Sequence, residues 1–269
     1  MKILNGKELA GFVKERQSHM VKTLKEAHIQ PTLLIIYDND NPVIQKYIQL
    51  KNRYGEDIGV KVEIHRAESS DDIATTIEEA NKNPNIHGII LQLPIKDQQK
   101  TDELTSKIAA EKDVDGLSNN ANAFDSATAT AINWLLTGYN IPLEKSKIAI
   151  IGRGKLVGAP LFKMYQASNY NVTQFHKGDD LSSLTNYDVI ITATGVPNLI
   201  TNEMIRPGTT IVDAGTASEK GVIKGDVSDE VRTRTDLTAI TPIIGGVGPL
   251  TISCLFDHVI QSASKSQKK

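Results

Sequence analysis

Cysteine is nearly absent from this chain of 269 residues, because Cys254 stands alone and can form neither an internal disulfide bond nor a cysteine metal cluster. Charge of one sign is also lacking: 30 Lys and Arg residues against 32 Asp and Glu residues leave −2, which argues against a general polyanion binder. No stretch approaches the ~18 consecutive apolar residues of a membrane span, and Met1–Arg16 lacks the apolar segment of a signal peptide. We therefore expect a cytosolic, water-soluble protein without a metal and without a nucleic-acid or membrane partner.

Hydrophobic residues make up 39% of the chain, enough for a full core, and at ~150 residues per domain the length favours two domains or one large one. Short continuous apolar runs such as Thr32–Tyr37 are typical of buried parallel strands, and segments with helical periodicity separate them. This alternation predicts an α/β fold with a mostly parallel sheet. The elements expected here are helices from Asn5, from Pro42 to about Asp57, from Ser70 and over 101–110, and strands over 32–37, 60–65 and 87–94.

The pattern restarts after a polar stretch, residues 96–126, which places a boundary near residue 120. We predict two lobes, residues 1–119 and 120–249, with a last helix from Pro249 whose residues 250–269 pack back on the first lobe. A frayed tail, SKSQKK, ends the chain. The elements expected in the second lobe are helices over 127–138 and 157–167, strands over 147–152, 171–176, 189–194 and 210–213, and a hairpin over 221–227.

A glycine-rich turn, G-R-G-K-L-V-G, follows the first strand of the second lobe. Gly152 permits the tight turn, Gly154 lets a pyrophosphate approach the backbone, and Gly158 lets the next helix pack close to the sheet. The spacing is one residue longer than the standard dinucleotide fingerprint, and a plain glycine turn of a doubly wound fold is the alternative. Two further glycine segments, at Gly195 and at Gly245–Gly248, could line the ribose and press against a planar ring.

The strand after this turn lacks the acid that holds the ribose 2′-hydroxyl of NAD, because it ends Gln174-Phe-His176-Lys177. Arg153 and Lys177 could instead meet a 2′-phosphate, which favours NADP over NAD. Two solvated basic side chains are the alternative. The neighbouring acids would oppose the phosphate if they faced it; these are Asp179 and Asp180.

Candidate chemistry in the first lobe begins with Tyr47 and Lys51, which are four residues apart and share one face of the expected helix. A lysine that loses solvent can act as an acid or base near neutral pH. Gln92 lies at the carboxyl end of an expected parallel strand, where its amide could orient Lys51 or bind substrate. Asp113 and Asp115 follow in a loop, and a carboxylate accepts two adjacent N–H groups of an amino-pyrimidinone ring. For each of these residues a solvated side chain is the plainer alternative.

Taken together, these segments resemble the bifunctional methylenetetrahydrofolate dehydrogenase/methenyltetrahydrofolate cyclohydrolase family nearly from end to end. The family's motifs occur here in order: Y-x-x-x-K, G-I-x-x-Q-L-P, K-D-V-D-G, G-R-x-x-x-V-G-x-P and G-G-V-G-P-x-T. Each motif alone is weak, whereas the ordered set makes chance similarity improbable. Their positions are Tyr47–Lys51, Gly88–Pro94, Lys112–Gly116, Gly152–Pro160 and Gly245–Thr251.

The resemblance implies an enzyme that oxidises methylenetetrahydrofolate with NADP and hydrolyses the methenyl product to 10-formyltetrahydrofolate. It implies a homodimer whose folate substrate binds in a cleft between an N-terminal catalytic lobe and a C-terminal Rossmann-like lobe. Lys51, Tyr47 and Gln92 would be catalytic, and folate would contact Tyr47, Asp115, Gly246 and Pro249. The residues implied for NADP are Gly152, Arg153, Gly154, Gly158, His176, Lys177, Thr128 and Gly195.

Departures from the family pattern fall mostly at or beside the nucleotide segments. Gly154 replaces a frequent Ser, and Thr128 alone remains of P-C-T-P-x-G. A cyclohydrolase with weak or no dehydrogenase activity therefore stays open, as does a non-catalytic folate- or nucleotide-binding paralogue. An unrelated dehydrogenase of a small acid would need a catalytic His or Lys beside the nicotinamide. The remaining departures are Ile44 for Ser, Ile243–Ile244 for V-P, and Asp213–Ala217 for D-V-G-I-N.

Overall fold

The structure is a computed structural model that describes residues 1–118, 120, 124–215, 217–219 and 222–266. The chain divides into two compact units. One comprises Met1–Ala10 and Thr128–Thr251, and we name it the six-stranded unit. The other comprises Gly11–Ala127 and Ile252–Lys269, and we name it the three-stranded unit. Residue 119, beside the predicted boundary, lies outside the described residues. So do residues 267–269 of the predicted frayed tail.

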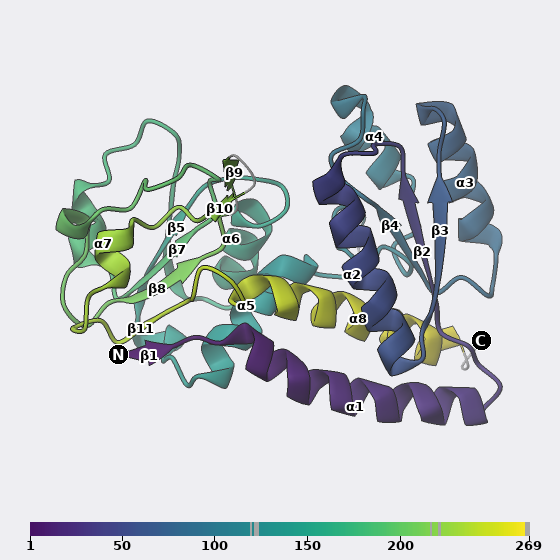
Figure 1. Cartoon of the computed structure of the whole chain (residues 1–269), viewed down its shortest axis with the longest axis horizontal. Helices are drawn as coiled ribbons and strands as arrows, with labels where there is room; N and C mark the ends of the chain where they lie inside the picture. Colours follow the sequence, from purple (N-terminus) through teal and green to yellow (C-terminus); the bar gives the residue numbers. More distant parts are fainter. Residues whose placement is uncertain (119, 121–123, 216, 220–221, 267–269) are drawn as a thin grey trace. The chain divides into compact units, whose positions relative to one another are not determined.

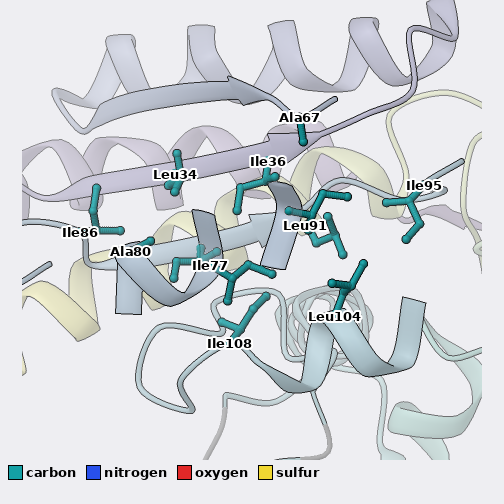
Figure 2. Close-up of a cluster of buried hydrophobic side chains, with 12 residues drawn as sticks. Leu34, Ile36, Ala67, Ile77, Ala80, Ile86, Leu91, Ile95, Leu104 and Ile108 are labelled. Atoms are coloured by element: carbon teal, nitrogen blue, oxygen red, sulfur yellow. The ribbon is translucent and has the colours of Figure 1, made fainter. Parts of the chain in front are cut away.

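The described part of the three-stranded unit contains a parallel sheet of order β3-β2-β4. Its strands are β2 (Thr32–Tyr37), β3 (Lys61–Arg66) and β4 (Gly88–Leu91), so the predicted strand over 32–37 is confirmed. The continuous apolar sequence of β2 reflects burial on both faces. Leu34 and Ile36 lie on one face, in a cluster with α3 side chains such as Ile77 (Figure 2).

Two long helices connect these strands (Figure 1). The first, α2 (Pro42–Ile58), begins after Asn41, whose side chain accepts from the Val43 N–H, and ends at Gly59 with φ +85°. The second, α3 (Ser70–Lys82), begins after Ser69, whose hydroxyl accepts from the Asp72 N–H. Both helices therefore start where a side chain caps the first turn, and α2 stops at a glycine in the left-handed conformation.

The short helix α4 (Thr101–Ser106), which follows the turn η1 (Gln98–Lys100), ends earlier than the predicted residue 110. Side chains capture the backbone groups that would have continued it. Asn81 donates to the Lys107 carbonyl at 2.7 Å and accepts from the Ala109 N–H at 2.9 Å, and Asn120 donates to the Ile108 carbonyl at 2.8 Å. Amide side chains thus replace the helical hydrogen bonds.

The described part of the six-stranded unit contains a parallel sheet of order β1-β11-β8-β7-β5-β6. The chain passes from β5 to β6 at the edge and then to β7 on the other side of β5. This reversal creates a topological switch point between β5 and β7, where open α/β sheets bind ligands. The strands are β1 (Lys2–Ile3), β5 (Lys147–Ile151), β6 (Asn171–Phe175), β7 (Val189–Thr192), β8 (Thr210–Asp213) and β11 (Ala239–Ile240).

The connections in this unit are short helices and turns, together with one antiparallel pair that matches the predicted hairpin in kind. Gly221 of that predicted hairpin lies outside the described residues. The connecting elements are α5 (Ala127–Gly138), η2 (Leu143–Lys145), α6 (Gly158–Ala167), η3 (Ser182–Asn186), η4 (Asn202–Met204), β9 (Ala217–Glu219), β10 (Val222–Lys224) and α7 (Asp229–Arg232).

The chain ends distribute between the units differently from the predicted lobes. Residues 1–10 belong to the six-stranded unit, because β1 pairs with β11 and the Lys7 N–H donates to the Gly245 carbonyl at 3.0 Å. Helix α1 (Gly6–Glu26) begins there and continues into the other unit. Helix α8 (Val247–Ser266) begins at Val247 rather than Pro249, since proline is compatible with a helix's first turn. No described helix is long and apolar enough to cross a bilayer.

Candidate functional site

Lys51 lies on α2 with only 8% of its surface exposed, beside the carboxyl end of β4. Its Nζ donates to Oε1 of Gln92 at 2.6 Å, and Gln92 is itself 8% exposed. Burial lowers the pKa of the Lys51 ammonium, and the charge of Asp115 partly offsets this effect. Neither Lys51 nor Gln92 is therefore a solvated surface residue, and Lys51 is set up to exchange a proton.

The two acids of the K-D-V-D-G loop have different environments. The Asp113 carboxylate accepts from the N–H groups of Gly116, Leu117 and Ser118 at 3.1, 3.3 and 2.8 Å, so it holds the loop together. Asp115 is half-buried, and burial raises the pKa of its carboxyl while Lys51 opposes that rise. Asp113 is thus a structural residue, and Asp115 is the acid that is electrostatically coupled to Lys51.

Further side chains fix this loop from two sides. Lys112 donates to the carbonyls of Ala80, Asn81 and Asn83 at 2.7 to 3.0 Å, which satisfies the carboxyl end of α3. His258 of α8 makes a hydrogen bond of 2.8 Å between Nδ1 and the Val114 carbonyl. Burial lowers the pKa of the His258 imidazole, which favours its neutral form. The loop that carries Asp115 is therefore preorganised.

Tyr47 lies one turn before Lys51 on α2, and its side chain is 40% exposed. A phenol ring at this position can contact a planar ligand without a prior change in the core. Ile44, at the position where the family usually has Ser, is buried instead, so it packs in the interior rather than offering a hydroxyl. The structure thus brings Lys51, Gln92 and Asp115 together, with Tyr47 on the same helix face by spacing.

The glycine turn after β5 needs glycine at two positions. Gly152 has φ +111°, and a Cβ there would lie 2.7 Å from the Ala193 carbonyl oxygen. A Cβ at Gly158 would overlap the Gly152 carbonyl oxygen, which is the close helix approach expected of this position. Gln174 of β6 donates to the carbonyls of both glycines at 3.0 Å. The protein itself therefore enforces this tight turn at the switch point.

Gly154 and its neighbours leave room for a ligand. No atom of the described residues lies within 4 Å of a Cβ built on Gly154. Packing within the protein therefore does not require glycine at this position. Arg153 and Lys177 are exposed, and the described residues provide neither with an ion-pair partner. His176, at the end of β6, has a buried Nδ1 without a hydrogen-bond partner among the described residues. An open backbone approach, two cationic side chains and an orphaned imidazole nitrogen fit a phosphorylated dinucleotide.

The acids that could have repelled a 2′-phosphate are engaged locally. Asp179 accepts from the His176 N–H at 2.7 Å. Asp180 accepts from the N–H and hydroxyl of Ser182 at 2.8 and 2.7 Å, and these bonds lower the pKa of its carboxyl. Both carboxylates remain exposed, so their charge is screened by solvent as well.

The remaining predicted site residues belong to the six-stranded unit. Gly195 follows β7 with φ +69°, a conformation that favours glycine. Gly246 is buried beside Gly6, whose added Cβ would overlap the Gly246 carbonyl oxygen, and Pro249 lies in the first turn of α8. Thr128 lies in the first turn of α5, and in the described part of the chain its side chain makes no hydrogen bond to the glycine turn.

Two family models match the chain. The model for the tetrahydrofolate dehydrogenase/cyclohydrolase catalytic domain matches residues 4–115, and the model for the NAD(P)-binding domain of the same family matches residues 126–267. The chain belongs to this family. The match to the NAD(P)-binding domain includes most of α8, although contacts assign residues from Ile252 onward to the three-stranded unit.

Individual members of the family are similar over nearly the whole chain. The bifunctional protein FolD of Lactobacillus acidophilus is 36% identical over 97% of this chain and 96% of its own. The crystal structure of the bifunctional enzyme FolD from Campylobacter jejuni has a TM-score of 0.93 and 32% identity, and covers 98% of this chain and 99% of its own. The crystal structure of the bifunctional dehydrogenase/cyclohydrolase from Thermoplasma acidophilum has a TM-score of 0.90 and 28% identity, and covers 100% of both chains.

Two residues that shape the surroundings of Lys51, Gln92 and Asp115 belong to none of the motifs of the sequence. Asp38, directly after β2, is buried and accepts from the Lys96 N–H at 3.1 and 3.2 Å, which ties down the loop that follows Gln92. His258 lies on the last helix, far along the chain from the loop it contacts. An acid that directly follows a buried strand is a signal that could have identified Asp38, whereas nothing local identifies His258.

Proposed function

We propose that the protein oxidises 5,10-methylenetetrahydrofolate with NADP and hydrolyses the resulting methenyltetrahydrofolate to 10-formyltetrahydrofolate. The observation that carries this proposal is the buried Lys51, hydrogen-bonded to Gln92 and coupled to Asp115. Membership of the family supports both activities, and the named relatives are bifunctional. The three residues belong to one unit, which also bears Tyr47.

In the hydrolytic step, Lys51 acts as the proton carrier. Its neutral amine takes a proton from water as the water oxygen bonds to the cationic methenyl carbon. The resulting ammonium returns this proton to N5 as the bond from N5 to the carbon breaks. The hydroxyl on the carbon releases its remaining proton to solvent and becomes the carbonyl of the formyl group on N10, so the net reaction releases one proton. Burial favours the neutral amine, and the Gln92 carbonyl oxygen orients Nζ.

Substrate binding is assigned to Asp115 and Tyr47. The Asp115 carboxylate accepts two N–H groups from the amino-pyrimidinone edge of the pterin, while the exposed Tyr47 ring packs on the folate. The K-D-V-D-G loop is held by Asp113, Lys112 and His258, so binding requires little ordering of this segment. Gly246 and Pro249 are proposed as further folate contacts on the basis of the resemblance alone.

NADP, when bound, supplies the hydride acceptor for the oxidative step. Gly152, Gly154 and Gly158 would receive its pyrophosphate at the amino end of α6, and Gly195 the ribose and nicotinamide side. Arg153, Lys177 and His176 would contact the 2′-phosphate, which is the basis for proposing NADP rather than NAD. The free cationic side chains and the locally bonded Asp179 and Asp180 support this choice. Thr128 is proposed as a further cofactor contact on the basis of the resemblance alone.

The proposal is tested with purified protein, methylenetetrahydrofolate and either NADP or NAD, followed by absorbance of the reduced cofactor. We expect turnover with NADP and a higher KM for NAD. In Arg153→Ala the KM for NADP should rise by about tenfold, as for one lost charge-assisted contact, and the KM for NAD should change little. No reduction of either cofactor, together with hydrolysis of methenyltetrahydrofolate, would establish a cyclohydrolase alone. Equal effects of Arg153→Ala on both cofactors would refute the 2′-phosphate assignment.

The coupling between Asp115 and Lys51 predicts a pH effect with a definite sign. The Asp115 charge raises the pKa of Lys51, so Asp115→Asn removes this contribution and lowers that pKa further. Because the neutral amine exists above its pKa, the rising limb of kcat for methenyltetrahydrofolate hydrolysis should move to lower pH. The measurement is kcat against pH after subtraction of uncatalysed hydrolysis. Asp57→Asn, an exposed acid on the same helix, is the control. A limb that stays in place or moves upward would contradict the coupling.

The resemblance also supports a cytosolic homodimer with no nucleic-acid or membrane partner. The near balance of charge argues against a general polyanion partner, and the single buried Cys254 is compatible with a reducing compartment.

A further inference from the structure

Asp226, which follows β10, has a fully buried carboxyl group. This group forms hydrogen bonds with the end of β7 and with the segment that follows it. Its Oδ2 accepts three hydrogen bonds: from the Thr192 hydroxyl at 2.6 Å, the Thr194 N–H at 2.7 Å and the Thr194 hydroxyl at 2.9 Å. Bonds to an ionised acceptor are among the stronger ones in proteins. The Asp226 side chain thus fixes both the backbone and the side chain of Thr194.

A second acid fixes Asp226 in turn. Oδ1 of Asp213 accepts from the Asp226 N–H, and its Oδ2 accepts from the Val227 N–H, both at 3.1 Å. Asp213 also forms an ion pair with Arg232, which donates to the Thr241 carbonyl at 3.1 Å. The backbone around Asp226 is therefore anchored to the ends of β8 and β11, and its carboxylate has a rigid base.

The segment that Asp226 holds, residues 192–195, packs against Gly152 of the glycine turn. A Cβ on Gly152 would lie 2.7 Å from the Ala193 carbonyl oxygen and 3.4 Å from the Thr194 methyl group. Gly195, with φ +69°, comes next in the chain. Asp226 thus controls the residues on the β7 side of the switch point, while the glycine turn forms the β5 side.

We propose that Asp226 is a positioning residue for the cofactor site, holding residues 192–195 in the conformation that receives the dinucleotide. This inference rests on the proposed function, because that function makes Gly152 and Gly195 cofactor contacts. Asp226 is too buried to contact the cofactor and acts through Thr194. Its hydrogen bonds fix the segment before the ligand arrives, so binding bears no further ordering cost there.

The test compares Asp226→Asn with a matched variant at the opposite end of β7. Asp188 precedes that strand, accepts from the Lys147 N–H at 2.7 Å and pairs with Arg206. Calorimetry of NADP binding to the full chain should show affinity about tenfold weaker in Asp226→Asn. A neutral amide oxygen accepts the three hydrogen bonds more weakly than a carboxylate, and the amide nitrogen is left at the place of Oδ1, which has no hydrogen-bond partner among the described residues. Asp188→Asn should remain within about twofold of the original protein. Hydrolysis of methenyltetrahydrofolate should be retained in both variants.

The outcomes separate the inference from the function on which it rests. If the original protein does not bind NADP, the proposed function fails. If it binds NADP and Asp226→Asn binds equally well, or if Asp188→Asn weakens binding as much, the positioning role is overturned. Should Asp226→Asn not fold, Thr194→Val and Thr194→Ser provide the second comparison. The Val variant should lose NADP affinity and the Ser variant, which keeps the hydroxyl, should recover it; equal affinities would overturn the inference.

Discussion

Lys51→Met should reduce kcat for methenyltetrahydrofolate hydrolysis by about 10²- to 10⁴-fold, the range for loss of a general acid–base group. Methionine keeps an unbranched side chain out to Cε and removes the amine that donates to Gln92 at 2.6 Å. Lys51→Arg should be equally slow, because a guanidinium cannot release a proton at accessible pH. These two variants separate proton transfer from packing and from charge.

The measurement is loss of methenyltetrahydrofolate absorbance, with folate binding determined separately by equilibrium dialysis. Binding should persist, since the proposed pterin contact is made by Asp115. NADPH production should fall less, because departure of a hydride from the methylene carbon requires no proton transfer by Lys51. Lys46→Met, an exposed lysine on the same helix, should retain the full rate. More than a tenth of the original rate in Lys51→Met would remove Lys51 from the mechanism.

Local chemistry allowed many elements to be predicted from the sequence. The run Thr32–Tyr37 forms β2 at the predicted residues, because both of its faces are buried and its ends carry turn residues. Pro42 and Gly59 delimit α2 through geometry that those residues favour by themselves. By contrast, β1 comprises only Lys2–Ile3 and pairs with Ala239–Ile240, and a two-residue strand has no periodicity to detect.

The candidate site divides in the same way. Spacing on one helix and the rule for strand ends were sufficient to single out Lys51 and Gln92, although their contact joins residues 41 positions apart. Sequence could not distinguish Asp113 from Asp115, because the difference depends on three N–H groups that the Gly116 turn aims at Asp113. The role of Asp226 has no local signature, because its threonine partners are 32 and 34 positions away. Long-range partners leave no periodic trace.

A final prediction uses three glycines to separate the fold of the cofactor site from its function. Gly158→Ala should lower the unfolding free energy by about 1–3 kcal/mol and abolish measurable NADP binding, because its Cβ would overlap the Gly152 carbonyl oxygen and open the turn. Gly154→Ala should leave the melting temperature nearly unchanged, since the described residues leave open space there, and should still weaken NADP binding. Gly11→Ala, on the exposed side of α1, should alter neither binding nor hydrolysis.

Melting temperature and NADP calorimetry on the three variants distinguish two causes of lost binding. A pyrophosphate that approaches the Gly154 backbone is blocked by a methyl group without any change in stability, whereas the effect at Gly158 arises within the protein and appears in both measurements. Methenyltetrahydrofolate hydrolysis should persist in all three variants that fold, because Lys51, Gln92 and Asp115 belong to the other unit. If Gly154→Ala binds NADP as tightly as the original protein, the pyrophosphate does not lie on this turn, and the cofactor assignment of the whole segment falls with it.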